Sequence, residues 1–166
     1  MATRPPLQAR GRRSFRERLR SRIAHLSFLA TRPMTLGVRG VVIDAAGAVL
    51  LVKHTYTAGW HFPGGGVEPG ETFESALSRE LAEEASVVVE PPVQLHGLFF
   101  NVHASRRDHV AVYVVRRFRL LGDRAPDREI LAVRFFAPDA LPEDATRGTR
   151  ARLAEILGSQ PIAQHW

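Results

Sequence analysis

The sequence of 166 residues contains no cysteine. This absence excludes disulfide frameworks, zinc sites built on thiolates and cysteine nucleophiles, so any metal must be held by oxygen or imidazole ligands. No apolar run approaches the roughly 18 residues that a membrane-spanning helix needs. A membrane-spanning protein is therefore not expected. The lack of cysteine agrees with a reducing compartment, and we expect a cytoplasmic location.

Lysine is almost absent as well, since Lys53 is the only one among 23 basic residues. The formal net charge is +6, but it is unevenly placed. The stretch from Met1 to Thr35 contains nine arginines and one glutamate, whereas the rest of the chain carries slightly more acids than bases. The basic character therefore belongs to an N-terminal arm and not to the folded domain.

The chain length allows one domain preceded by a tail. We place the basic arm at residues 1–34 and the domain at residues 35–166. From Ser14 onward, Phe15, Leu19, Ile23 and Leu26 recur at helical spacing among arginines, which predicts a basic amphipathic helix. Packing on the domain is favoured for this helix, and contact with RNA or an anionic membrane is the alternative.

Beyond the arm, β-rich runs and two helical stretches alternate with turn signals. Asp44 to Gly47 predicts a turn that joins the first two strands as an antiparallel hairpin. Thr72 is the expected N-cap of the first helix, and Gly158 is expected to end the second. The predicted strands are Gly37–Ile43, Ala48–Val52, Trp60–Phe62, Leu95–Phe100, His109–Phe118 and Ile130–Phe136, and the predicted helices are Thr72–Ala85 and Arg150–Leu157.

Three acids share one face of the first predicted helix. At 100° per residue, Glu80, Glu83 and Glu84 fall within about one third of the circumference. Like charges packed this closely are unfavourable unless a cation joins them, and a hard divalent ion such as Mg²⁺ or Mn²⁺ suits carboxylate oxygens. We expect Arg79 to brace Glu83 by an i, i+4 pair. We also expect Glu84 to be the most buried acid, with the most perturbed pKa.

A glycine-rich loop precedes this helix. Gly64, Gly65 and Gly66 allow close approach of the backbone and positive φ angles. Amide N–H groups at the start of a helix attract anions. Metal ion and phosphate are therefore expected to meet between this loop and the acids.

The order and spacing of these residues are specific. The stretch Gly65-x5-Glu71-x7-Arg79-Glu80-Leu81-x-Glu83-Glu84 resembles the Nudix box, and Val87 occupies the last aliphatic position of that motif. Chance agreement of six residue types at one starting position is about 10⁻⁷. Ser86 stands where the motif has glycine. A left-handed cap there would cost a serine about 1 kcal/mol, which a different cap would avoid.

The resemblance implies an α/β fold, the Nudix α/β/α sandwich with a mixed sheet. It also implies an Mg²⁺- or Mn²⁺-dependent pyrophosphohydrolase, and Nudix proteins often form homodimers. By position in the motif, Glu83 and Glu84 would be metal ligands, Glu80 a ligand or general base, and Arg79 and Glu71 orienting residues. Many Nudix proteins recruit a further carboxylate from outside the box, and the candidates for that role are Glu129 and Asp108.

The substrate implied is a nucleoside diphosphate linked to another group. A nucleotide sugar, a nucleoside triphosphate and a dinucleoside polyphosphate all remain open. Two other hypotheses are a regulatory Nudix domain that binds nucleotides without cleaving them and an RNA 5′-end processing enzyme that uses the basic arm. Candidate phosphate-binding residues are Arg39, Arg106 and Arg107, and candidate base-stacking residues are His54, Tyr56, Trp60 and Phe99. A solvated turn at Arg106–Arg107 and core packing of the aromatic residues are the alternatives.

Overall fold

A computed structural model describes residue 27 and residues 33–166 of the chain. The chain divides into two compact units, residues 1–33 and 34–166. The amphipathic helix that we predict from Ser14 lies outside the described residues, and the boundary that we place after residue 34 stays a prediction. No helical segment in the described part of the chain has the length and apolar character of a membrane span.

The second unit is a mixed α/β fold. The strands β1, β6 and β5 form one sheet, in which β1 runs parallel to β6 while β5 runs antiparallel to β6. The strands β3, β2 and β8 form an antiparallel sheet, and β4 pairs with β7. In chain order the elements are β1 Thr35–Val42, β2 Val49–His54, β3 Trp60–His61, α2 Phe73–Ala85, β4 Val87–Val89, β5 Gln94–Phe100, β6 Asp108–Val115, β7 Phe118–Leu120, β8 Ile130–Phe136 and α3 Arg147–Ile156.

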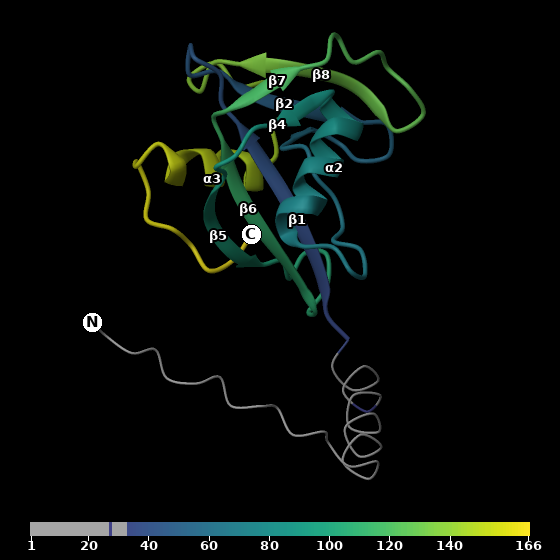
Figure 1. Cartoon of the computed structure of the whole chain (residues 1–166). Helices are drawn as coiled ribbons and strands as arrows, with labels where there is room; N and C mark the ends of the chain where they lie inside the picture. The colour runs from purple at the N-terminus through teal and green to yellow at the C-terminus, as the bar shows by residue number, and fades with distance from the viewer. Residues whose placement is uncertain (1–26, 28–32) are drawn as a thin grey trace, which may run out of the picture. The chain divides into compact units, whose positions relative to one another are not determined.

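The two helices cover opposite faces of the strands, which confirms the predicted α/β/α sandwich (Figure 1). Alternate residues of β6 divide between two cores: Ala111 and Tyr113 pack with Leu77 and Leu81 of α2, whereas Val112 packs in the core that contains α3. A strand with apolar side chains on both faces is buried on both faces. This burial holds α2, the helix that carries the acidic residues, firmly against β1 and β6.

The prediction that the first two strands pair with each other as an antiparallel hairpin is wrong. The turn forms, because the Asp44 carboxylate accepts hydrogen bonds from the N–H groups of Ala46 and Ala48 at 2.9 and 2.8 Å. Beyond one bridge between Ile43 and Val49, however, the strands separate. The whole of β1 pairs with β6 and β2 pairs with β3 and β8, so partners distant in sequence replace the neighbouring strand.

Other elements differ from the prediction as well. The predicted strand His109–Phe118 is two strands, β6 and β7, interrupted at residues 116 and 117, and the short strand β4 was not predicted. The last helix begins three residues earlier than expected because the side chain of Thr146 accepts a hydrogen bond from the N–H of Thr149 and forms the N-cap.

Both ends of α2 show how its sequence sets its limits. Thr72 forms a capping box with Ser75, as its predicted N-cap role requires. At the other end Ser86 adopts the left-handed conformation, with φ 53° and ψ 34°. Ser86 therefore does not avoid the strained cap that the Nudix box assigns to glycine.

Replacing Ser86 by glycine should therefore stabilise the protein. Gly adopts positive φ without the steric cost of a Cβ, so the Ser86→Gly variant should gain about 1 kcal/mol in free energy of unfolding. Urea denaturation followed by circular dichroism measures this gain. Ser86→Ala is the matched control, because it removes the hydroxyl and keeps the Cβ. Equal stability of the glycine and alanine variants would show that the backbone conformation carries no strain.

Candidate active site

Three acids of α2, Glu80, Glu83 and Glu84, line a cavity of about 330 Å³ beside the glycine-rich loop. A fourth glutamate, Glu129, reaches the same cavity from the segment just before β8. The residues that line it are Arg39, His54, Tyr56, Thr57, His61, Gly64, Gly65, Glu80, Glu83, Glu84 and Glu129. The structure therefore brings together four carboxylates from two separate segments of the chain.

The glycine-rich loop lies along β1 and forms one wall of the cavity. Backbone hydrogen bonds join the N–H of Val38 to the carbonyl of Gly65 and the N–H of Gly40 to that of Pro63, both at 2.9 Å. Gly64 has φ 139°, and a Cβ at this position would overlap the Val38 carbonyl. A Cβ on Gly65 would overlap the Glu80 carboxylate. Glycine at both positions lets the loop lie directly against β1 and the acidic helix.

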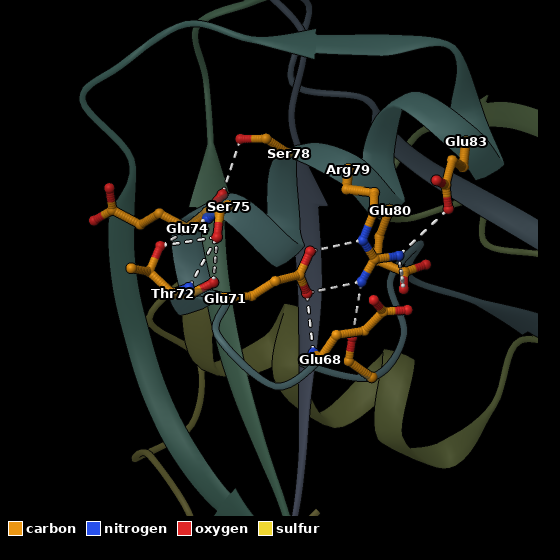
Figure 2. Close-up of polar contacts among 10 residues, drawn as sticks. Glu68, Glu71, Thr72, Glu74, Ser75, Ser78, Arg79, Glu80 and Glu83 are labelled. Carbon is orange, nitrogen blue, oxygen red and sulfur yellow. Dashed lines mark hydrogen bonds and ion pairs between the residues drawn. The ribbon is translucent and has the colours of Figure 1, made fainter.

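Arg79 connects the loop to the acids (Figure 2). Its guanidinium binds both carboxylate oxygens of Glu71, at 2.9 and 3.0 Å, and donates to Glu80 at 2.8 Å and to the Gly66 carbonyl at 3.0 Å. The expected pair with Glu83 is present but longer, at 3.4 Å. Glu71 is thus the principal partner of Arg79, whereas the sequence pointed to Glu83.

The pKa of Glu71 is held well below its usual range, to about 2, by hydrogen bonds from Arg79 and from the N–H of Glu68. In turn, Glu71 and Glu80 raise the pKa of Arg79. A planar guanidinium that meets a carboxylate through two hydrogen bonds is fixed in direction as well as position. Arg79 therefore orients Glu80 at the cavity wall.

Glu84 is electrostatically the most perturbed acid of the cavity. Burial raises its pKa to about 7, although a hydrogen bond from the Gly64 N–H, at 2.7 Å, and the nearby Arg39 favour the charged form. The perturbed pKa agrees with the prediction. The predicted order of burial does not, because the side chains of Glu84 and Glu80 are almost equally exposed, at 14% and 12%, compared with 61% for Glu83.

His54 lies behind Glu84, with Nε2 at 3.6 Å from a Glu84 carboxylate oxygen. Burial, assisted by Arg39 and His61, lowers the pKa of His54 to about 4, so the imidazole is neutral near pH 7 and the contact is not an ion pair. Its Nδ1 is buried without a hydrogen-bond partner. Among the described residues, Arg39 is therefore the one cation that lines the cavity at neutral pH.

The other predicted substrate residues divide into two groups. Arg39 lines the cavity and donates hydrogen bonds to the carbonyls of Gly64 and Phe62. Arg106 and Arg107 do not line it; they lie in the turn between β5 and β6, which favours the alternative of a solvated turn. Asp108 does not line it either, and its carboxylate accepts hydrogen bonds from Thr35 and Asn101 at 2.7 and 2.8 Å.

The aromatic candidates divide in the same way. Trp60 and Phe99 are buried in the core, whereas Tyr56 lines the cavity with 71% of its surface exposed, and His54 lines it from a buried position. His61 and Thr57 also line the cavity and were not predicted. Strand alternation could have predicted His61. Its neighbour Trp60 points into the core, and successive side chains of a strand point to opposite faces.

The side-chain atoms of the cavity lining that could bind a metal ion are oxygens and imidazole nitrogens, and most of them belong to carboxylates. This donor set fits a hard divalent cation. In the part of the chain that the structure describes, however, no three acidic or histidine side chains already converge as a metal site. Glu80 and Glu83 instead lie within reach of Arg79, at 2.8 and 3.4 Å.

The NUDIX domain model matches residues 33–156. A MutT-like protein from Streptomyces ambofaciens is 31% identical over 123 residues, which are 74% of this chain and 77% of that protein. An RNA pyrophosphohydrolase from Serratia proteamaculans is 43% identical over only 47 residues, 28% of this chain and 27% of that protein.

Solved structures show the same fold. A MutT NUDIX hydrolase from Burkholderia pseudomallei superimposes with a TM-score of 0.64 at 25% identity, covering 74% of this chain and 97% of that one. A NUDIX hydrolase from Nitrosomonas europaea gives a TM-score of 0.63 at 22% identity, covering 80% and 97%. With a family model matched over most of its length and a relative 31% identical over 74% of it, the chain belongs to the Nudix family of pyrophosphohydrolases.

Proposed function

We propose that this protein hydrolyses a pyrophosphate bond in a nucleoside diphosphate linked to another group, with Mg²⁺ or Mn²⁺ as cofactor. The observation that supports the proposal most directly is the single cavity shared by Glu80, Glu83, Glu84 and Glu129. Nudix hydrolases generally use divalent cations. Such an ion would neutralise the diphosphate oxygens and lower the pKa of a bound water.

The residues of the chain have separate tasks in this proposal. Glu80, Glu83 and Glu84 supply oxygen ligands, and Glu129 adds a further carboxylate from the opposite segment. Arg79, held by Glu71, orients Glu80. Because Arg39 is a cation that lines the cavity, it is the residue proposed to contact the substrate phosphate.

The chemical step follows from this arrangement. A water oxygen attacks one phosphorus, the bond to the bridging oxygen breaks, and a carboxylate of the cavity accepts the water proton. The products are two phosphate-bearing fragments. The complete set of acids argues against a regulatory domain that only binds nucleotides. The matches to RNA pyrophosphohydrolases cover 47 residues, so they support the shared motif and leave the substrate open.

A substrate panel with an isosteric variant tests the proposal. The purified protein is incubated with Mg²⁺ and nucleotide sugars, nucleoside triphosphates, dinucleoside polyphosphates or 5′-triphosphorylated RNA, in water labelled with ¹⁸O. Mass spectrometry then identifies the products and the phosphorus that received the label. We expect metal-dependent cleavage of one class, and we expect Glu83→Gln to lose at least about 100-fold in kcat/KM, the order typical of an acid–base or metal-binding carboxylate.

Glu74→Gln is the matched control. Glu74 is an exposed acid on the same helix and is not among the residues that line the cavity, so its variant should keep full activity. Retained activity in Glu83→Gln would remove Glu83 from the mechanism. Nucleotide binding without cleavage of any substrate would favour the regulatory domain instead.

A further inference from the structure

The loop that joins β7 to β8 is attached to the end of α2 by one arginine. In Figure 1 this loop lies next to the C-terminal end of α2, and the contact is made by Arg124, whose Nε donates to the carbonyl of Glu83 at 2.9 Å. A second nitrogen of the same guanidinium, Nη2, pairs with Asp127. Only 21% of the Arg124 side chain is exposed, although it lies in a surface loop. The fork of the guanidinium thus bridges the helix and the loop.

Asp127 connects Arg124 to the backbone of Glu129. One oxygen of Asp127 pairs with Arg124, and the other accepts hydrogen bonds from the N–H groups of Glu129 and Ile130, both at 2.8 Å. The backbone of Glu129 is also held from the other side, because its carbonyl accepts from the Thr55 N–H at 2.9 Å.

A continuous path therefore joins two acids of the cavity. It runs from the Glu83 carbonyl through Arg124 and Asp127 to the Glu129 backbone, and both end residues line the same cavity. These two acids come from segments far apart in the sequence, and among the described residues no strand pairing joins the β7–β8 loop to α2. Arg124 and Asp127 are the hydrogen-bonding side chains that span this gap.

We infer that Arg124 is a positioning residue, which through Asp127 sets the place of Glu129 relative to Glu83 so that both carboxylates can serve one divalent cation. This inference rests on the proposed function. A residue that only stabilised the end of α2 would affect unfolding and leave the metal affinity unchanged. A residue that acts through Glu129 must affect the metal affinity, and its effect must vanish once Glu129 has no carboxylate.

Titration calorimetry with Mn²⁺ on the full chain tests the inference. We expect Arg124→Gln to weaken Mn²⁺ binding about 10-fold, the lower end of the range for residues that orient ligands. Asp127→Asn should weaken it to a similar degree because it loses the charge that holds Arg124. In the Glu129→Gln background, Arg124→Gln should have no further effect. Arg119→Gln is the matched control, since Arg119 is a surface arginine on the neighbouring β7 strand and pairs with Glu90.

Thermal unfolding of each variant verifies that it is folded at the temperature of the titration. If Arg124→Gln does not fold, Arg124→Lys replaces it, because a lysine keeps the charge but cannot bridge both partners with the fork of a guanidinium. Unchanged Mn²⁺ affinity in the folded variant, or an equal effect with and without Glu129, would overturn the inference. If Glu83→Gln also leaves Mn²⁺ binding unchanged, the proposed function fails as well. Loss of binding in Glu83→Gln alone would reject only the role of Arg124.

Discussion

Replacing Arg152 by methionine is expected to lower the free energy of unfolding by about 3–5 kcal/mol, because it leaves a buried carboxylate without its counter-ion. Arg152 of α3 is 2% exposed, and its guanidinium binds both carboxylate oxygens of Glu155. It also lies 4.1 Å from the ring centre of Phe99 and donates to the carbonyl of His165 at 2.9 Å. One side chain thus joins the helix, the sheet and the C-terminal segment.

The pKa of Glu155 shows how strongly its charge is supported. Burial would raise this pKa, yet hydrogen bonds from Arg152, from the Ala163 N–H and from His96 together hold it below its usual value. Without Arg152, the burial penalty is opposed only by the remaining two bonds. The carboxylate must then either take up a proton or draw water into the core, and both outcomes destabilise the native state.

Urea unfolding of the metal-free protein at pH 7 measures the decrease in free energy of unfolding. Two control variants test whether the unpaired Glu155 carboxylate causes it. The double variant Arg152→Met/Glu155→Leu should recover most of the stability, since apolar side chains can replace a buried ion pair at little cost. Arg119→Met removes an arginine whose side chain is 65% exposed, and it should change stability by less than about 1 kcal/mol. A loss below about 1 kcal/mol for Arg152→Met would contradict the prediction.

The Glu84→Gln variant should abolish the loss of stability that Glu84 causes in the metal-free protein as the pH rises. In the wild type the pKa of Glu84 is raised from 4.5 to about 7, so the folded state binds more protons than the unfolded state between these pH values. Stability from this group is complete below pH 4.5 and is lost as the pH rises through 7. The loss is about 3 kcal/mol at 1.36 kcal/mol per pKa unit. Glutamine has no charge to bury and keeps an oxygen for the Gly64 N–H.

The measurement is a set of urea unfolding curves for both proteins between pH 4 and pH 8, without metal. Because His54 titrates in the opposite sense over the same range, the informative quantity is the variant stability minus the wild-type stability at each pH. This difference should increase by about 3 kcal/mol from pH 4 to pH 8. A difference independent of pH would show that Glu84 titrates normally in the folded protein.

A divalent metal ion should stabilise the wild type more than the Glu84→Gln variant. Saturating Mg²⁺ stabilises any folded state that binds it, so the wild type at pH 8 should gain stability with increasing Mg²⁺ while Glu84→Gln gains little. The Glu74→Gln variant, whose changed acid is exposed and outside the cavity, should behave as the wild type does. Equal stabilisation of all three proteins by Mg²⁺ would exclude Glu84 as a ligand.

Local sequence was sufficient for the acidic helix and its limits. Thr72 caps α2 as predicted because an N-cap depends on residues within one turn. Glu80, Glu83 and Glu84 share a face because helical periodicity places them there. The β-rich run His109–Phe118 likewise predicted the strand β6 over most of its length.

Contacts between distant segments could not be deduced in this way. The arginine that orients Glu80 takes Glu71 as its main partner because the loop folds back on the helix, although helical spacing pointed to Glu83. The parallel pairing of β1 with β6 over eight residues replaced the expected hairpin, and it joins segments that lie far apart in the sequence. Arg106 and Arg107 lie in a polar turn like many phosphate-binding loops, and only the fold shows that this turn lies apart from the cavity.

By itself, the sequence determined the family and the helix on which three of the acids lie, because these depend on residue types at fixed local spacing. Only the tertiary structure decided which of two candidate acids, Glu129 or Asp108, reaches the cavity, that His61 and Thr57 line it, and that burial raises the pKa of Glu84. These properties depend on distance and desolvation in three dimensions, which the order of residues along the chain does not specify.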